Sequence, residues 1–279
     1  MLKGLGSQSS KSPMLAFVQA ALVRPLVVAG RAGEAFARHS GAMSLLVWRS
    51  LVVVFTGKLP MRELLAQLRS MGVQSIPLVL VTATLSGVVT TQQGGYQFTN
   101  SIPMYVLGSV VTSSVILELA PVMTAFVLIG RVGARITAEL GTMQVSEQID
   151  AMYSLGRDPV RYLAAPRLLA GLIATPLLVA MADAAGVFAG MIAGRLAVGL
   201  GSDAFLYGAR LFWHDWDLFY SLTKGLVFGF VIPLVATHMG LATRGGAEGV
   251  GNATTRSVVF MILSVLLLHA LFPPLLLSR

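Results

Sequence analysis

The stretch Glu118–Arg167 reads ELAPVMTAFVLIGRVGARITAELGTMQVSEQIDAMYSLGRDPVRYLAAPR and lies between two long apolar segments. It contains most of the charged residues that recur at regular spacing. In the whole chain, 55% of the 279 residues are hydrophobic and only 11% are charged. Soluble domains carry about 25% charged residues, so this composition indicates an integral membrane protein. A membrane protein that keeps so patterned a polar segment between its spans usually docks a soluble partner there.

Five segments are long and apolar enough to cross a bilayer, which needs about 20 apolar residues. They cover residues 76–93, 104–130, 168–194, 218–242 and 257–277. We therefore predict an all-α integral membrane protein with one five-span domain over residues 76–279.

The first 75 residues follow a different pattern. The apolar run Met14–Gly30 is interrupted by Arg24-Pro25, and the later run Leu45–Phe55 is only eleven residues long. A proline breaks the hydrogen-bond ladder of a helix, and an arginine at mid-depth in a bilayer is costly. We predict that residues 1–75 form N-terminal interfacial amphipathic helices, and an extra span at residues 43–59 remains the alternative.

Lys and Arg residues are distributed unevenly between the two sides that five crossings would create. Sixteen of the twenty fall on the side of the N-terminus. Because basic residues are enriched in cytoplasmic loops, we predict a cytoplasmic N-terminus and a periplasmic C-terminus. Because these basic residues lie beside apolar segments, where they would set the topology, the net charge of +8 does not indicate a protein that binds nucleic acid. The polar start of the chain, MLKGLGSQSSKSP, predicts no cleavable signal peptide.

A short amphipathic helix is predicted between the second and third spans, at about residues 146–156. Its polar stripe recurs every three or four residues and consists of Glu147, Asp150, Ser154 and Arg157. The opposite stripe consists of Ile149, Met152, Tyr153 and Gly156. Ser146 suits the N-cap, Gly156 suits the C-terminal end, and Asp158-Pro159 suits the start of the next helix. Such a helix either rests on lipid headgroups or inserts into a groove on a partner protein.

The run from Gly130, GRVGARITAELGTMQVSEQIDAMYSLGRDPVRYLAAPR, closely resembles the MlaE/YrbE-type permease family. The resemblance extends to Gly72–Gly87, Asp215–Gly229 and Gly245–Val259, so it covers most of residues 60–270. These proteins are the membrane subunits of lipid-handling ABC transporters. The resemblance implies a homodimeric permease with five spans, preceded by interfacial helices. Family members occur in bacterial inner membranes and in chloroplast envelopes; no transit-peptide pattern is seen, so we expect the bacterial inner membrane.

The family implies that the chain moves phospholipids or related lipids between the inner membrane and a periplasmic MCE-domain lipid-binding protein. Its further partners would be a cytoplasmic ABC ATPase and a small STAS-type regulatory subunit. The family's coupling helix to the ATPase corresponds here to Glu147, Gln148, Asp150, Met152, Tyr153 and Leu155. The chain has no G-x-x-x-x-G-K-[ST] phosphate loop, so we expect ATP and Mg on the partner and no enzymatic activity or bound cofactor here.

Ionisable residues inside the predicted spans are costly and normally face a cavity or a partner. Glu118 lies in the second span, where the family usually reads R-E-L-G-P; this chain has Leu117 in place of the arginine. Glu118 either lines the lipid path or makes a structural hydrogen bond. Lys224 begins the fourth span and is predicted to extend to the outer surface.

Two more ionisable residues lie within the spans. Asp183, in the third span, neighbours a ladder of small residues that lets helices approach closely, namely Ala182, Gly186, Gly190 and Gly194. We therefore favour an interhelical hydrogen bond for this carboxyl group. His269 lies in the last span, where the family often carries Asp, and either tunes the local charge or occupies an exposed position.

Alignment with the family places Thr90, Gln97, Phe98 and Ser101 beside its lipid pocket. The Gln- and Gly-rich run over residues 92–98 is either part of this path or an outside loop. No cysteine is present and the four histidines share no ligand spacing, so we expect no metal site.

Alternative functions are an autonomous secondary transporter, an intramembrane enzyme acting on lipids and a lipid-binding membrane scaffold. A secondary transporter would predict inverted repeats and several paired intramembrane charges, which are not evident in the sequence. An enzyme would need polar clusters for acid–base or metal chemistry within the spans, and none is evident there either.

Overall fold

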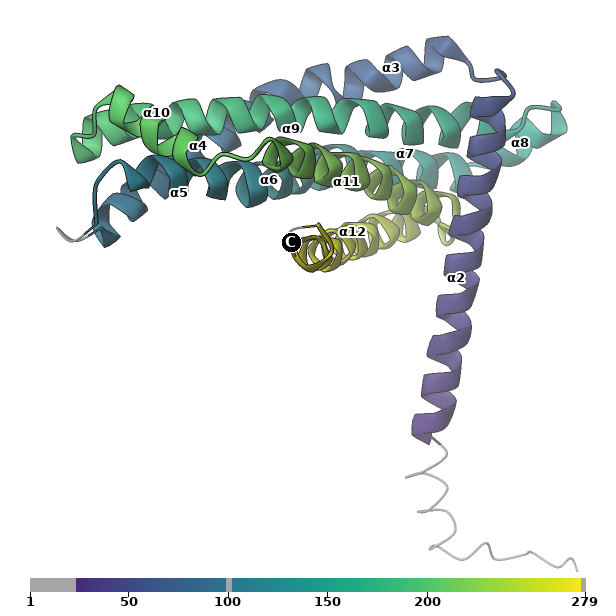
Figure 1. Ribbon diagram of the computed structural model, residues 1–279. Coiled ribbons are helices and arrows are strands. Elements are labelled where there is room, and N and C mark those ends of the chain that lie inside the picture. The colour runs from purple at the N-terminus through teal and green to yellow at the C-terminus, as the bar shows by residue number, and fades with distance from the viewer. Residues whose placement is uncertain (1–23, 99–101, 277–279) are drawn as a thin grey trace, which may run out of the picture. The chain divides into compact units, whose positions relative to one another are not determined.

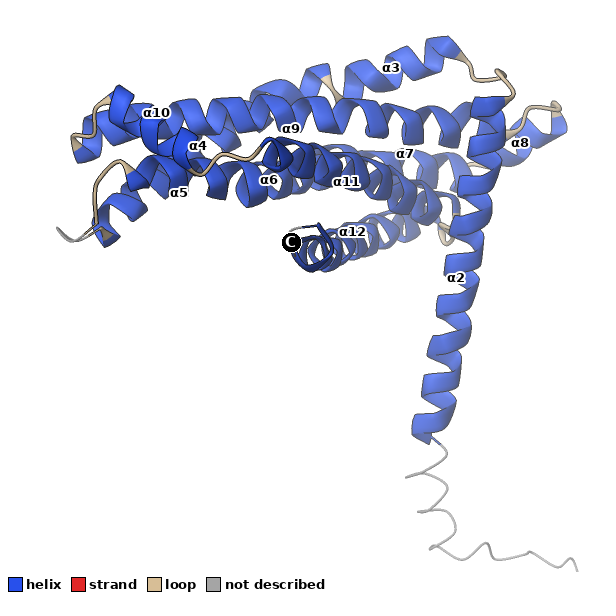
Figure 2. Cartoon of the chain, in the orientation of Figure 1, coloured by secondary structure: helices blue, strands red, loops and turns tan. Residues whose placement is uncertain are grey.

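The computed structural model describes residues 24–98 and 102–276, which form helices joined by short loops and contain no strand (Figure 1 and Figure 2). In chain order the helices are α2 (Arg24–Phe55), α3 (Met61–Met71), α4 (Ile76–Gln97), α5 (Val106–Ser114), α6 (Ala120–Leu128), α7 (Ala134–Val145), α8 (Gln148–Ser154), α9 (Ala165–Ala193), α10 (Ser202–Leu211), α11 (Asp215–Leu241) and α12 (Gly246–Leu276). Short turns of 3₁₀ or π-helix adjoin several of them, at Val73–Ser75, Val115–Leu119, Ile129–Gly133, Val160–Ala164 and Gly194–Val198.

The chain divides into two compact units, Met1–Leu45 and Leu46–Arg279. The described part of the first unit belongs to α2, and Arg24 is its first described residue. Residues before Arg24 lie outside the described part of the chain, so the predicted interruption at Arg24-Pro25 and an interfacial position for this region both stay predictions.

Five stretches are long and apolar enough to cross a membrane: Met61–Gln97, Val106–Val145, Val160–Val198, Asp215–Leu241 and Gly246–Leu276. Their number and order confirm the predicted all-α membrane fold. The extra span at 43–59 is not among them. Residues 43–55 are the last part of the more polar helix α2, which ends at Phe55. The first stretch includes α3, so the helix predicted to lie along the interface continues through a 3₁₀ turn into the first span.

Helix α9 lies at the centre of the second unit and packs against α4 and α11. Glycines allow these contacts: a Cβ atom at Gly87 of α4 would overlap the carbonyl oxygen of Gly186 on α9. On the other side, a Cβ atom at Gly171 would overlap the carbonyl oxygen of Gly229 on α11. The close approach at Gly186 confirms that the predicted ladder of small residues serves helix packing.

The two ends of the second unit differ. The short helix α8 lies at one end, and α10 lies at the other, beside α5 (Figure 1). Gly108 of α5 and Gly208 of α10 bring these segments into backbone contact. A Cβ atom at Gly108 would overlap the carbonyl oxygen of Phe205 on α10, and one at Gly208 would overlap that of Tyr105, just before α5. The ring of Tyr105 also meets that of Tyr207 edge to face, with centroids 5.4 Å apart.

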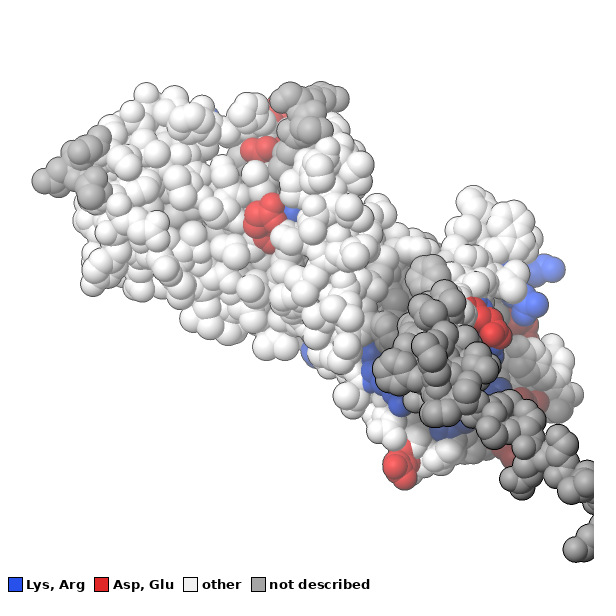
Figure 3. Space-filling view, turned by 90° about the horizontal axis from the view of Figure 1, so that it is seen from below, with Lys and Arg blue, Asp and Glu red and all other residues white. Residues whose placement is uncertain are grey.

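The first and fifth spans are the least buried of the five. Helix α4 exposes a stripe at helical spacing that consists of Leu78, Val81, Leu85 and Val89. Helix α12 exposes a second apolar face, which includes Val259, Leu263, Leu267 and Leu271. These two faces are available to lipid or to another copy of the chain. Most of the face shown in Figure 3 likewise carries no charged atom.

Candidate functional site

Three spans converge on Glu118. This residue lies in the π-helical turn Val115–Leu119, which joins α5 to α6 within the second span. Its Oε2 atom lies 3.0 Å from Nζ of Lys224 on α11 and 2.8 Å from Nε2 of His269 on α12. Turns of π-helix inside α-helices are frequent at functional sites, because the extra residue redirects a side chain.

Lys224 is held in this cluster by several contacts. Its ammonium group donates to the carbonyl oxygen of Leu117 at 2.6 Å as well as to Glu118, and it lies 4.4 Å from the ring centroid of Tyr220. The lysine side chain is fully buried. The prediction that Lys224 extends to the outer surface is therefore wrong, because Glu118 and the Leu117 carbonyl provide acceptors inside the protein.

The cluster is open on the side of its carboxylate. The side chain of Glu118 is 40% exposed and that of His269 is 26% exposed, whereas Lys224 has no exposure. Although Leu117 replaces the family's arginine, Glu118 is not left unpaired, since Lys224 supplies the positive charge. A carboxylate backed by a buried ammonium can accept hydrogen bonds from a polar group that enters from the open side.

Asp183 makes the interhelical hydrogen bond that was predicted for it. Its Oδ2 atom accepts from Oγ of Ser221 at 2.8 Å, which joins α9 to α11. The residue is 4% exposed, and its Oδ1 atom has no hydrogen-bond partner among the described residues.

Helix α8 begins differently from the prediction. Ser146 is not its N-cap, because the Ser146 side chain bonds back to the carbonyl oxygen of Thr142 at 2.7 Å and ends α7. Glu147 precedes α8 with a left-handed φ of 59°, which interrupts the helical backbone between α7 and α8. The backbone carbonyl of Glu147 then accepts from Ala151.

The C-terminal end of α8 confirms the prediction for Gly156, which has a φ of 69°. The N–H of Gly156 bonds to the carbonyl oxygen of Tyr153 and that of Arg157 to Met152, the pair of bonds that defines a Schellman motif. Asp158 then caps the next helix as predicted, since its Oδ1 atom accepts from the N–H of Val160 at 3.0 Å.

The two faces of α8 have different surroundings. Ile149 is buried and Met152 is half-buried, so this side packs against the rest of the protein. The predicted polar stripe is exposed. Tyr153 and Leu155 are 56% and 76% exposed, so two large apolar side chains remain on the outer surface beside the polar stripe. The predicted apolar stripe is thus divided, and Tyr153 faces outward.

The site geometry can now be compared with known proteins. The family described as Permease MlaE matches residues 64–274. The chain belongs to this family. A relative from Synechocystis sp., named "Probable ABC transporter permease protein", is 37% identical over 212 residues, which cover 76% of this chain and 81% of the relative.

Two further relatives of this MlaE-family chain extend the comparison. A protein of the same name from Rickettsia prowazekii is 36% identical over 224 residues, which cover 80% of this chain and 86% of the relative. "Protein TRIGALACTOSYLDIACYLGLYCEROL 1, chloroplastic" from Arabidopsis thaliana is 34% identical over 232 residues, which cover 80% of this chain and 66% of that protein.

Of the residues aligned with the lipid pocket of the MlaE family, Thr90 and Gln97 lie on the last turns of α4 and Phe98 directly follows it. The Gln- and Gly-rich run is helical through Gln97, so it is not an outside loop up to that residue. Thr90 is half-buried and bonds to the carbonyl oxygen of Ser86, Gln97 is exposed, and Phe98 is half-buried. Ser101 lies outside the described residues. No hydrogen bond or ion pair in the described part of the chain joins these residues to Glu118, and their role stays a prediction.

Sequence reasoning missed two arginines that join helices of the MlaE-family domain. Arg167 is 2% exposed and lies 2.7 Å from Glu139, which ties α9 to α7. Arg131 donates to Oγ of Ser75 at 2.6 Å and ties the second span to the 3₁₀ turn between α3 and α4. A charged side chain next to an apolar segment normally interacts with a polar group elsewhere in the chain. The sequence does not reveal which one, because the partners lie 28 and 56 residues away.

Proposed function

We propose that the chain is the permease subunit of an ABC transporter that moves phospholipids or related lipids, driven by a separate ATPase. Membership of the MlaE permease family supports the permease role. The names of the relatives from Synechocystis and Rickettsia prowazekii support the ABC transporter class. No P-loop occurs in the chain, so ATP and Mg would be bound by the partner.

The observation that carries this proposal is the outer surface of α8. Tyr153 and Leu155 are exposed there next to the acidic side chain of Asp150, although a seven-residue helix gains nothing from exposing large apolar groups to water. Exposed aromatic and aliphatic groups beside charges are typical anchors of a protein interface. Because α8 is held by Ile149 and sits between α7 and the start of the third span, a partner that moves it would also move those spans.

A lipid is the substrate that best fits the site. The name of the Arabidopsis relative contains a galactolipid, trigalactosyldiacylglycerol, which supports lipid transport for this chain too. Glu118 and His269 offer polar groups to a headgroup at the open side of the cluster, and the neighbouring spans are apolar enough for acyl chains.

The remaining parts of the proposal concern assembly. A homodimer would cover the exposed apolar faces of α4 and α12. A periplasmic MCE-domain protein would exchange lipid with this subunit, and a small STAS-type protein would regulate the ATPase. These partners, the bacterial inner membrane and the cytoplasmic N-terminus rest on the resemblance to the MlaE family and on the distribution of basic residues.

Co-purification tests the coupling role of α8. The chain is purified in detergent from cells that also express the neighbouring genes, as wild type and as the variant Tyr153→Ala/Leu155→Ala. The matched control is Tyr207→Ala/Leu211→Ala, which removes the same two side-chain types from α10 at the opposite end, where they are also exposed.

We expect an ATPase to travel with the wild type and the control, and the α8 variant to retain at least about tenfold less, since interface anchors contribute about 2 kcal/mol or more each. Equal retention by all three proteins would remove α8 as the coupling element. Absence of any ATPase with the wild type would contradict the transporter class itself.

A further inference from the structure

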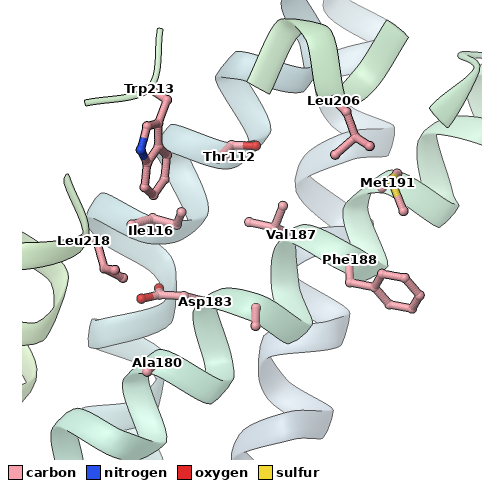
Figure 4. A pocket seen from close by; sticks show the side chains of 11 residues that line it. Thr112, Ile116, Ala180, Asp183, Val187, Phe188, Met191, Leu206, Trp213 and Leu218 are labelled. Atoms are coloured by element: carbon pink, nitrogen blue, oxygen red, sulfur yellow. The ribbon is translucent and has the colours of Figure 1, made fainter. Parts of the chain in front are cut away.

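A second pocket, separate from the Glu118 cluster, has a volume of about 380 Å³. It is formed by the second, third and fourth spans together with α10, and its lining includes Ile116, Ala180, Ala184, Met191, Leu206 and Trp213 (Figure 4). Neither Glu118 nor any of the aligned lipid-pocket residues on α4 lines it. The volume falls in the range of small-molecule sites, about 300–1,000 Å³.

The surface that this pocket presents is apolar and open. Two of its lining residues, Thr112 and Asp183, are polar, but they are only 5% and 4% exposed, so they contribute almost no polar surface. By contrast, Ala184 and Phe188 are exposed, so the pocket is a groove on the outer face of the spans. Because the outer face of a span is surrounded by hydrocarbon, such a groove suits a hydrocarbon chain.

The groove has about the depth of one leaflet of a bilayer. On α9 its lining runs from Ala180 to Met191, which are eleven residues or about 16 Å apart along the helix. The hydrocarbon of one leaflet is about 15 Å thick, half of a core of about 30 Å. The third apolar stretch ends at Val198 and the fourth begins at Asp215, so α10 lies between their ends, at the membrane surface.

Aromatic side chains support this position of the α10 end. Large exposed rings gather on α10 and on the segment that follows it, namely Tyr207, Phe212, Trp213, Trp216 and Phe219. Trp and Tyr are enriched where the hydrocarbon meets the headgroups. Figure 4 shows Trp213 and Leu206 at one end of the pocket and Ala180 at the other. The groove therefore runs from the level of the headgroups into the hydrocarbon.

Two arginines follow the lining residues at the headgroup end. Arg195 comes four residues after Met191, and Arg210 lies one helical turn beyond Leu206 on the same face of α10. The turn that holds Arg195 contacts α10, and the carbonyl oxygen of Arg210 accepts from the N–H of Trp213. Both arginines are exposed, and neither has an ion pair or a side-chain hydrogen bond with any residue that the structure describes.

We propose that this groove binds a membrane phospholipid, with one acyl chain along α9 and its phosphate at Arg195 and Arg210. Guanidinium groups bind phosphate through paired, charge-assisted hydrogen bonds. A lipid without phosphate would leave both arginines without an anion, and a soluble phosphate would leave the apolar groove uncovered. This phospholipid is distinct from one that passes the Glu118 cluster, and its binding does not depend on the transport function.

Binding is tested with the full chain in detergent through the fluorescence of Trp213, which lines the groove. A Trp48→Phe/Trp216→Phe background leaves Trp213 as the only tryptophan. One probe is a phosphatidylglycerol brominated in its acyl chains, and the other is the diacylglycerol with the same chains. Bromine quenches tryptophan fluorescence at short range, so both probes report occupation of the groove, and only the first carries a phosphate.

Two variants of this background remove the two parts of the site. Arg195→Gln/Arg210→Gln removes the positive charges, and Ala184→Phe fills the groove from an exposed position. The matched controls change the same residue types outside the groove. They are Arg244→Gln/Arg256→Gln, two exposed arginines beside and within the start of α12, and Ala66→Phe, an exposed alanine of α3.

We expect phosphatidylglycerol to quench Trp213 saturably, and diacylglycerol to give only the weak linear quenching of a probe dissolved in the micelle. The arginine variant should bind phosphatidylglycerol at least about tenfold more weakly, since it loses two charge-assisted contacts. Ala184→Phe should lose saturable quenching, and both controls should behave as the background does. Equal quenching by the two probes, or unchanged binding of phosphatidylglycerol in either groove variant, would overturn the proposal.

Discussion

At the scale of single residues, the cluster around Glu118 is asymmetric in exposure. Lys224 is completely buried, whereas the Glu118 carboxylate is 40% exposed. Removing one partner of a buried ion pair is costly when the remaining charge stays buried and less costly when water can reach it. The two members of this pair should therefore respond differently to substitution.

We predict that Glu118→Leu destabilises the protein by about 3 kcal/mol or more, because Lys224 then stays buried without a counter-charge. Lys224→Met should cost clearly less, since the carboxylate left behind is partly exposed. The double variant should be more stable than Glu118→Leu alone. Chemical or thermal unfolding in detergent measures all three, with exposed Lys58→Met as the control. A Lys224→Met protein less stable than Glu118→Leu would contradict this interpretation.

Residue-scale predictions from the sequence succeeded where the determinant is local. Gly156 and Asp158 occupy the helix ends expected of them, because end signals act within a few residues. Lys224 was misplaced since its acceptors lie 106 and 107 residues away, a distance that no spacing pattern reports. Ser146 was misassigned because a serine between two helices can serve either one, and here it bonds to the preceding helix.

At the scale of elements, packing of α9 against α4 depends on the absence of side chains. Gly87 and Gly186 face each other so closely that the backbone of one helix contacts that of the other. Association of helices in lipid relies on such contacts, because lipid tails are as apolar as leucine and provide no hydrophobic driving force. The sequence predicted the ladder on α9, but it could not show that Gly87 is the opposing residue.

We predict that Gly87→Ala destabilises the protein by about 1–3 kcal/mol, the usual cost of overpacking, because the added methyl group would overlap the Gly186 carbonyl. Gly130→Ala is the matched control, since nothing lies within 4 Å of a Cβ atom there. Its stability should be unchanged or slightly raised. Thermal melting measures both variants, and equal melting temperatures would show that α4 and α9 can separate without cost.

At the scale of the whole molecule, the lengths of the apolar segments alone predicted all five spans. A segment can cross a bilayer when it is long and apolar enough, and this property is visible in the sequence without knowledge of tertiary contacts. It could not predict which spans are central. Helix α9 is half-buried by its neighbours, whereas the first and fifth spans expose most of their apolar surface. The arrangement of the Glu118 cluster and of the second pocket depends on this packing, so neither could be derived from spacing.

We predict that the exposed face of α12 forms a contact between two copies of the chain. Because the chain has no cysteine, a single Leu263→Cys substitution provides a unique attachment point on that face. It should give a covalent dimer with a short thiol cross-linker in membranes. Leu177→Cys is the control, as it is 63% exposed on α9. Cross-linking at Leu177 and not at Leu263 would assign the contact to a different span.

For the lipid transport proposed for this chain, the burial of Lys224 behind Glu118 would have a consequence for selectivity among headgroups. A molecule that travels past this cluster meets the carboxylate before it can reach the ammonium group, since only Glu118 and His269 are exposed. Headgroups that present a positive end, such as ethanolamine or choline, would be attracted there. A headgroup with only negative charge would be repelled unless Glu118 first moved aside. Selection among headgroups would then depend on which of the two charges is exposed, and not on the net charge of the Glu118–Lys224 pair.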